Sequence, residues 1–417
     1  MSQRNAARNR FYSIVCAWFS CLLLAGLLVA CGDAPATTGI TPARTAANAA
    51  PGVSDSEIVL GSWGPQSGPA ASYGVVDRAI DAYFKKINAE GGINGRKIKF
   101  LTEDDGYNPA RTLTAVKKLV EQDQVFALVG GMGTAQNVAV TDYLVSHNVP
   151  HVAPATGSSV MCCQPLKRNI FALQTNYSVE AKLLTRYAHN SLNLKKAAVF
   201  YQNDPFGKEG LEAIQAELKS LNLSEAQAVS YDTSEKDFSS QALKLQATGA
   251  DTLILWSTPQ PTAAILKEIQ KLGWKPTILM SVVNDDPVMF QLAGSALDGV
   301  TFSMWLPNFM DSNDPKIKQY NEFMKQYMPT EPVGGFSLTG MAIAQVMVEG
   351  LKRAGRDLTR ESFINAMETF RDWNNGLAYK LNYSPVNRQG QNAVAFYQAD
   401  AKNQIFVKKS EIIEDKP

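Results

Sequence analysis

The sequence predicts an α/β fold made of two Rossmann-like lobes, each with a doubly wound parallel sheet. Short apolar runs of strand length alternate with amphipathic helical stretches between residues 57 and 159, and the alternation starts again at residue 177. Such uninterrupted alternation is typical of parallel sheets. The chain is also long enough for two or more domains, with 417 residues of which 45% are apolar.

The first unit begins with a predicted strand at residues 57–63, followed by a helix whose apolar residues recur at helical spacing. Glycines end that helix and lead into a predicted strand at residues 97–105. Pro109 then marks the start of a second helix. The second strand ends in Asp104 and Asp105, which we expect to cap a turn rather than to act as paired acids.

Residues 125–159 form the segment around which the sequence is organised, and they read as strand, glycine-rich loop, helix, strand and hydroxyl-rich loop. Thr134 follows the glycines and stands where a helix N-cap belongs, so the helix start suits a small anion such as a carboxylate. The second loop holds Ala155 to Ser158. Both loops should open toward the ligand crevice of a doubly wound sheet. Ordinary closure of a βαβ unit is the alternative reading of these loops.

The second unit repeats the pattern of the first, and the segment at residues 169–175 can bridge the two. Its strands are predicted at residues 197–202, 226–232, 251–257 and 277–281, with helices before and between them. Beyond residue 299 the alternation breaks. Amphipathic helices are predicted at residues 314–328, 337–354 and 359–370, and a strand-rich segment ends the chain.

The N-terminal residues have the pattern of an export signal. Three arginines precede an apolar run at residues 11–30, which ends in Leu-Val-Ala-Cys at Cys31. We therefore expect residues 1–30 to be a bacterial lipoprotein signal peptide and Cys31 to carry lipid. An uncleaved anchor is the alternative, because twenty apolar residues can span a bilayer. Residues 31–53 are rich in Ala, Thr, Pro and Gly and predict a flexible linker, so the body is expected in the periplasm or at the outer face of the cell membrane.

Charge and cysteine usage narrow the function further. The chain has 40 basic and 39 acidic residues; residues 1–30 hold three arginines and no acid, so 37 basic residues would remain against 39 acidic ones. This balance indicates no nucleic-acid partner. Cys162 and Cys163 are the adjacent cysteines left after the signal and Cys31. A strained disulfide between them and two free thiols both stay open.

The sequence contains no recognisable catalytic, cofactor or metal site. The segment GGMGTAQ follows a strand, but a dinucleotide fingerprint requires glycine where Gln136 stands. Ser67 lies among glycines without the spacing of a nucleophile elbow. His147, His151 and His189 lack metal or triad spacing, so we expect them in the core or at the surface. We therefore predict a protein that is not an enzyme and binds no metal or cofactor.

Several stretches distributed over the chain share one family resemblance. They are IVLGSWGPQSGPAASYG, INAEGGINGRKIKFLTEDDGYNPARTLTAVKKLVEQDQVFALVGG, NVPHVAPAT, LQTNYSVEA, YQNDPFGKEG, EKDFSSQALKLQATGADTLIL and FQLAGSALDGVTFS. Together they resemble the substrate-binding proteins of branched-chain amino acid ABC transporters, which are leucine/isoleucine/valine-binding-protein-like members of the type 1 periplasmic binding proteins. The resemblance runs from about Asp55 to beyond Lys352, and INAEGGINGR and EDDGYNP are its most specific parts.

The resemblance implies two lobes that close over a ligand and are joined by a three-crossing hinge. The crossings are expected near Phe171 to Asn176, near Phe302 to Pro307 and somewhere after Trp373. Lobe 1 would then comprise residues 54–174 plus 305–375, and lobe 2 residues 175–304 plus 376–413.

The resemblance also implies which residues bind the ligand. Thr134 matches the family's hydroxyl for the ligand carboxylate. The loop that grips carboxylate and ammonium matches Ala155, Thr156, Gly157 and Ser158, with the last three interchangeable because of a one-residue gap. Aromatic pocket positions match Tyr73, Phe206 and Phe336, although core packing is the alternative for Phe336.

The chain departs from the family pattern on the second lobe. Val282 stands where leucine-binding relatives carry a glutamate for the ammonium, and their tyrosine falls near Thr258 or Pro259. Asn284 or Asp285 could take over the ammonium contact. Trp63 and Trp256 are expected to help enclose the apolar body of the ligand.

These expectations combine into an extracytoplasmic solute-binding lipoprotein of an ABC importer. It would bind an amino acid or related small carboxylate, deliver it to permease subunits, attach to the membrane through Cys31 and be a monomer. A ligand-sensing receptor for a signalling partner is the alternative, which a neighbouring kinase gene in place of a permease gene would favour. A hydrolase-type enzyme is disfavoured by the absent triad.

Overall fold

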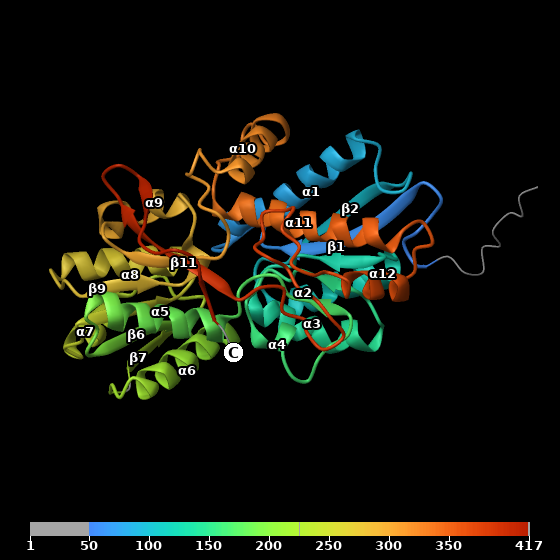
Figure 1. Cartoon of the computed structure of the whole chain (residues 1–417). Helices are drawn as coiled ribbons and strands as arrows, with labels where there is room; N and C mark the ends of the chain where they lie inside the picture. Colours follow the sequence, from blue (N-terminus) through green and yellow to red (C-terminus); the bar gives the residue numbers. More distant parts are fainter. Residues whose placement is uncertain (1–49, 225, 416–417) are drawn as a thin grey trace, which may run out of the picture. The chain divides into compact units, whose positions relative to one another are not determined.

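Two sheets with helices on their faces organise the computed structural model, which describes residues 50–224 and 226–415 (Figure 1). All of these residues belong to one compact unit. The predicted signal peptide at residues 1–30, the lipidation site Cys31 and most of the predicted linker at residues 31–53 lie outside the described residues.

The first sheet is parallel throughout and has the strand order β2-β1-β3-β4-β5. Its strands are β1 (Glu57–Gly64), β2 (Lys97–Asp104), β3 (Ala127–Val129), β4 (His151–Val152) and β5 (Ile170–Phe171). The helices between them are the short 3-10 helix η2 (Ala71–Tyr73), α1 (Gly74–Ala89), α2 (Pro109–Lys117) with its π-helical continuation η3 (Lys118–Gln122), α3 (Thr134–Ser146) and α4 (Ser159–Cys162). The predicted alternation of residues 57–159 is confirmed.

Local sequence signals account for the turn after β2. The Asp104 carboxylate accepts hydrogen bonds from the Gln66 and Gly106 N–H groups, and the buried Asp105 carboxylate accepts from the Tyr107 N–H at 2.9 Å. Asn108 then caps α2, and Pro109 occupies the first turn of the helix, where its missing N–H costs nothing. The prediction that both aspartates cap a turn is confirmed.

Three later helices pack on the first lobe, and the first of them contacts α1. They are α10 (Pro315–Tyr327), α11 (Gly335–Ala354) and α12 (Arg360–Met367). α11 lies along α1, and its Gly340 faces the Val76 carbonyl so closely that a Cβ at this position would overlap it. α12 packs on α11, and Phe363 of α12 meets Phe126 edge to face with 5.6 Å between ring centroids. These contacts place the chain's later helices on the first lobe.

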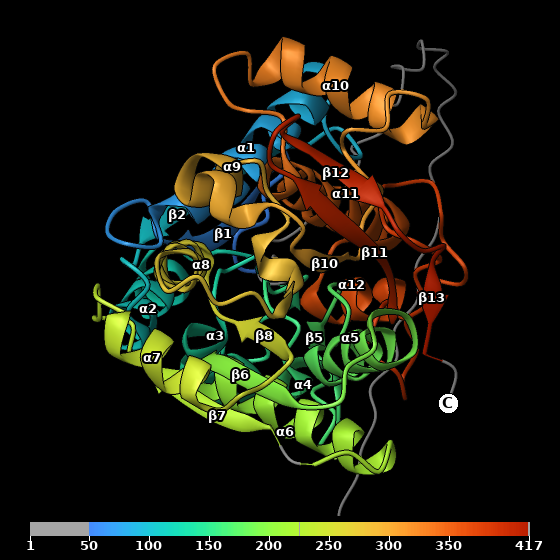
Figure 2. The ribbon, with the colours of Figure 1, turned by 90° about the vertical axis from the view of Figure 1, so that its left-hand side faces the viewer.

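The second sheet has the order β12-β11-β10-β9-β8-β6-β7, and β13 pairs with β11. Its strands are β6 (Ala197–Gln202), β7 (Gln227–Tyr231), β8 (Thr252–Trp256), β9 (Thr277–Met280), β10 (Thr301–Met304), β11 (Ala393–Asp400), β12 (Ile405–Lys408) and β13 (Ile413–Glu414). Its helices are α5 (Tyr177–Leu192), α6 (Pro205–Ser220), α7 (Ser239–Ala247), α8 (Pro259–Lys271), the 3-10 turns η4 (Val282–Asn284) and η5 (Gly294–Leu297), and α9 (Val288–Ala293). Strands β6 to β10 are parallel, whereas β11, β12 and β13 add antiparallel pairs. Figure 2 shows β11 and β12 beside β10 at one edge of this sheet.

Three chain segments cross between the sheets, and hydrogen bonds join them side by side. Residues 172–176 follow β5, residues 305–307 follow β10, and residues 389–392 precede β11. The Ala172 N–H donates to the Arg388 carbonyl and the Ala172 carbonyl accepts from the Gly390 N–H, each at 2.9 Å. The Gln391 amide donates to the Trp305 carbonyl at 3.1 Å. The first two crossings lie where they were expected, and the third follows Trp373.

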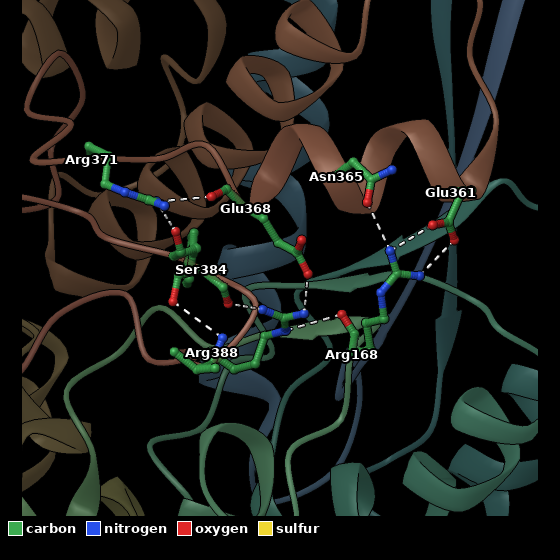
Figure 3. A network of polar contacts seen from close by, with 9 residues as sticks. Arg168, Glu361, Asn365, Glu368, Arg371, Ser384 and Arg388 are labelled. Atoms are coloured by element: carbon green, nitrogen blue, oxygen red, sulfur yellow. Dashed lines mark hydrogen bonds and ion pairs between the residues drawn. The ribbon is translucent and has the colours of Figure 1, made fainter.

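A polar network holds the segment before the third crossing against α12 (Figure 3). Arg388 is 1% exposed, pairs with Glu368 at 2.6 Å, donates to the Ser384 and Arg168 carbonyls, and lies over the Phe171 ring. These contacts favour a third lobe boundary near Gln389 over the predicted boundary between residues 375 and 376. The division of the chain into lobes otherwise stays a prediction.

Candidate ligand-binding site

A cavity of about 50 Å³ lies where loops of both sheets and the crossings meet. Each loop follows the carboxyl end of a parallel strand, which is the usual ligand position in such folds. The lining residues are Tyr73, Val76, Tyr107, Met132, Gly133, Thr134, Ala155, Gln174, Tyr177, Phe206, Thr258, Val282, Val283, Asp285, Trp305, Phe336 and Thr339. The lining is mainly apolar and aromatic with few polar groups, as is typical of small-molecule sites.

The glycine-rich loop after β3 fixes the position of Thr134. Gly133, with φ of 101°, is the N-cap of α3, and Thr134 is the first helical residue. The prediction that Thr134 is itself the N-cap is therefore wrong. The cause is Gly133, whose positive φ makes the turn into the helix and leaves the Thr134 side chain free for another contact.

That other contact is a hydroxyl pair at the cavity wall. Thr134 Oγ1 lies 2.8 Å from Thr156 Oγ1, and Thr156 Oγ1 also accepts from the Ser158 N–H at 3.2 Å. Tyr177 lies beside the pair. Burial raises the pKa of its phenol, whereas the Gly157 backbone, Thr156 and Thr134 act to lower this pKa. Thr134 and Tyr177 line the cavity, whereas Thr156 is fully buried behind Thr134.

Aromatic rings form much of the remaining wall. Tyr73 and Phe336 meet with ring centroids 4.8 Å apart, and Tyr177 and Phe206 with centroids 5.1 Å apart. Trp256 packs behind Phe206 at 5.9 Å and lies over Gly210 of α6, where any Cβ would overlap the indole. Trp256 therefore supports the cavity wall without lining it.

Acidic groups gather on the second-lobe side. Asp285 lines the cavity and is 6% exposed; its pKa is raised well above the usual value by burial, and by the nearby Asp286 and Glu180. Asp286 has its own partners, since it accepts from the Phe336 N–H at 3.0 Å and the Val288 N–H at 2.9 Å. In the part of the chain that the structure describes, no hydrogen bond or ion pair joins the Asp285 carboxylate to another residue. Asp285 is thus a buried carboxyl group that faces the cavity with open hydrogen-bonding capacity.

Glu180 of α5 lies behind Val282 and is fully buried. Its carboxylate accepts from the Val282 N–H at 2.7 Å and the Ser303 hydroxyl at 2.7 Å. Burial raises its pKa to about 7, against these hydrogen bonds. Glu180 thereby holds the loop that carries Asp285. The position aligned with the family's glutamate is the apolar Val282, and Glu180 supports this position from behind.

Hydrogen bonds also cross the cavity from one lobe to the other. The Tyr73 hydroxyl donates to the Val283 carbonyl at 3.0 Å, and the Ser158 hydroxyl and Ser159 N–H donate to Glu209 of α6 at 2.8 and 2.9 Å. Together with the contact of Phe336 with Asp286, they tie the rims of the cavity together.

The structure brings together part of the predicted site. The predicted residues that line the cavity are Tyr73, Thr134, Ala155, Phe206, Asp285 and Phe336. The predicted residues that do not line it are Trp63, Thr156, Gly157, Ser158, Trp256 and Asn284.

Three of these non-lining residues have other partners. Trp63 packs against His151 beneath Gly131, with 5.2 Å between ring centroids and the rings tilted by 47°. The Asn284 amide donates to the Ser257 and Ser281 carbonyls inside the second lobe. The Ser158 hydroxyl bonds to Glu209.

Sequence reasoning missed Tyr107, Gln174, Tyr177 and Trp305 as lining residues. Tyr107 and Tyr177 belong to the EDDGYNP and LQTNYSVEA stretches, and Gln174 and Trp305 lie in or beside predicted crossings. The sequence therefore placed these segments near the cavity, because crossing segments border it. It did not indicate which of their side chains face the ligand. Cys162 and Cys163 are free thiols, the first buried and the second exposed, and neither lines the cavity.

Two α/β lobes that are joined by three crossings around a small aromatic cavity define a two-lobed solute-binding protein. The chain belongs to the periplasmic binding protein family, whose model matches residues 57–404. The predicted fold class and family resemblance are confirmed by this match and by the solved structures below.

Relatives of known name support the same family. A Pseudomonas aeruginosa protein named "Amino acid binding protein" is 26% identical over 218 residues, which are 52% of this chain and 58% of that protein, so the match spans little more than half of its length. "Leu/Ile/Val-binding protein homolog 7" of Brucella abortus is 25% identical over 331 residues, covering 75% of this chain and 81% of that protein.

Solved structures share the fold at low sequence identity. A fatty acid ABC transporter substrate-binding protein from Thermomonospora curvata has a TM-score of 0.80 at 23% identity, covering 88% of this chain and 95% of that one. A branched-chain amino acid ABC transporter protein from Thermus thermophilus with bound valine has a TM-score of 0.80 at 20% identity, covering 87% and 98%.

Residues 50–224 and 226–415 contain neither a candidate membrane span nor a candidate metal cluster. None of their helices is both long and apolar enough to cross a membrane. No group of three or more His, Cys, Asp or Glu side chains among them is arranged to hold a metal ion.

Proposed function

We propose that this protein is the extracytoplasmic solute-binding lipoprotein of an ABC importer. It binds an amino acid or a related small carboxylate in the cavity between its lobes and delivers it to the permease. Residues 1–30 direct export, and Cys31 carries the lipid that holds the mature chain at the membrane.

One observation carries the ligand class: the cavity has a hydroxyl pair at a helix start on one lobe and a carboxyl group with open hydrogen-bonding capacity on the other. Thr134 and the N–H groups of the first turn of α3 suit a ligand carboxylate. Asp285 suits a ligand ammonium group, because a buried charge needs an opposite charge or hydrogen bonds to be tolerated. The aromatic wall between them suits an apolar body.

The names of relatives agree with this chemistry. Amino acids and Leu/Ile/Val appear in the names of two relatives, and valine and fatty acids in the descriptions of two structures of the same fold. All of these compounds join a carboxylate to an apolar body, and the amino acids add an ammonium group. Asp285 favours the ligands that carry the ammonium group.

Calorimetry can test the proposal with leucine, isoleucine, valine and their deaminated acids. We expect the amino acids to bind more tightly than the deaminated acids, because the latter leave Asp285 without a partner. Equal or tighter binding of the deaminated acids would exclude the Asp285 contact and leave a carboxylate receptor. Absence of binding to both series would refute the proposed ligand class.

A further inference from the structure

A second cavity of about 80 Å³ adjoins the ligand cavity, and the same two residues border both. It is lined by Pro69, Ala70, Gly106, Tyr107, Thr233, Thr258 and Pro261. Tyr107 and Thr258 appear in both linings. Both residues therefore border each cavity, and the Tyr107 side chain is the larger of the two.

The backbone holds Tyr107 in this position. Its φ is 61°, a left-handed conformation that is rare for a bulky residue. The buried Asp105 stabilises this conformation by accepting from the Tyr107 N–H, and it also accepts from the Thr112 hydroxyl at 2.6 Å. The turn after β2 therefore fixes the backbone of Tyr107 and the direction of its Cα–Cβ bond.

The neighbours of the ring fit it closely. A Cβ at Gly133 would lie 2.8 Å from Tyr107 Cε2, so the missing side chain at Gly133 makes room for the ring beside Thr134. The Tyr107 phenol lies near Gln202 of the second lobe: burial raises the pKa of the phenol, and the Gln202 side chain acts against this rise. Gln202 is fully buried and bonded to Tyr231 at 2.8 Å and Asp204 at 2.7 Å. Tyr107 thus lies between the two lobes and borders both cavities.

We infer that Tyr107 determines the length of the ligand. The inference rests on the proposed function and narrows it: with Tyr107 in place, the ligand cavity accepts amino acids with short or branched side chains. A longer straight chain can continue only into the second cavity, and the ring stands in its way. Removal of the ring joins the two cavities into one elongated site.

The test compares valine, norleucine and 2-aminooctanoate by calorimetry on three variants. Tyr107→Gly and Tyr107→Asn both remove the ring, and both residue types tolerate the left-handed backbone, so the turn should survive. Tyr107→Phe is the matched control, because it keeps the ring and loses only the hydroxyl group. Thermal melting reports whether each variant is folded.

We expect the wild type to bind valine most tightly and 2-aminooctanoate most weakly. In the two ring-deletion variants the order should reverse, with affinity rising about fourfold for each added methylene that becomes buried. Tyr107→Phe should keep the wild-type order, whatever its absolute affinity.

A folded ring-deletion variant that keeps the wild-type order would overturn the role of Tyr107. A reversed order in Tyr107→Phe would overturn the assignment to the ring, because the hydroxyl group would then set the length. A wild type that binds none of the three amino acids would instead refute the proposed function. A wild type that already prefers 2-aminooctanoate would refute the length limit while leaving the amino acid class intact.

Discussion

Asp285 offers the sharpest test of the ligand site, through the substitution Asp285→Asn. The amide has nearly the same shape as the carboxyl group but cannot become negative. A charge-assisted hydrogen bond contributes about 1.5 to 3 kcal/mol, so valine should bind about 10- to 150-fold more weakly. The deaminated acid of valine makes no contact that needs the charge, and its affinity should not fall.

Proton release gives an independent readout of the same contact. Burial, Asp286 and Glu180 raise the pKa of Asp285, so the neutral carboxyl group persists to higher pH in the empty site than in a free aspartate. An ammonium ligand favours the ionised form, and binding should therefore release a proton. The affinity for valine should rise as pH rises through the raised pKa of Asp285, until the ligand amine itself loses its proton.

Calorimetry in two buffers with different ionisation enthalpies measures this release, which should vanish in Asp285→Asn. Asp81→Asn is the matched control, because Asp81 pairs with Lys85 on the exposed side of α1. If Asp285→Asn weakens valine and its deaminated acid equally, or leaves both unchanged, the assignment of Asp285 to the ammonium group is refuted.

Three further substitutions test the site and its support. Thr134→Val should weaken carboxylate binding by about tenfold or more in calorimetry. Thr141→Val on the same helix should leave binding unchanged, because the Thr141 hydroxyl bonds only within α3 and to Met161. Equal effects of the two substitutions would argue against the role of the hydroxyl pair. Arg388→Met should lower the free energy of unfolding by about 3 to 5 kcal/mol, because it leaves the Glu368 carboxylate without its charged partner. Arg168→Met breaks an exposed ion pair and should lower the free energy of unfolding by less than about 1 kcal/mol. Similar losses for the two variants in denaturant titration would contradict the network of Figure 3. Burial raises the pKa of Glu180 to about 7, so its contribution to stability is complete below its ordinary pKa of 4.5 and is lost as pH rises through about 7. Glu180→Gln should flatten the pH dependence of the free energy of unfolding between about pH 4.5 and 7. An unchanged slope in this range would refute the raised pKa of Glu180.

The sequence predicted the architecture because strand and helix periods depend on short-range patterns. The runs around Leu60 and Val129 are buried on both sides, and the order of the units follows from uninterrupted alternation. The antiparallel edge formed by β11 and β12 was visible only as a strand-rich ending. The direction of a strand depends on which neighbour it pairs with, and no local pattern encodes that choice.

The site was harder to predict because one residue of displacement decides whether a side chain faces a cavity. Asn284 and Asp285 are adjacent, yet the first donates into the second lobe and the second lines the cavity. Trp256 ends a strand at the correct edge but turns onto Gly210. Tyr107 was included only as part of the EDDGYNP stretch of the family resemblance, whereas the structure places it in the cavity lining with a left-handed backbone.

The lateral bonding of the three crossings limits how the lobes can move. Bending about an axis across the segments requires only small changes in their backbone angles, whereas sliding or twisting would break the bonds of Ala172 with Arg388 and Gly390 and the bond of Gln391 to Trp305. The joint should thus have one soft direction. Lobes that move along one direction lose little orientational entropy when they close over a ligand. Less of the free energy of the interlobe contacts is then needed to offset that entropy loss, and more of it contributes to the ligand affinity.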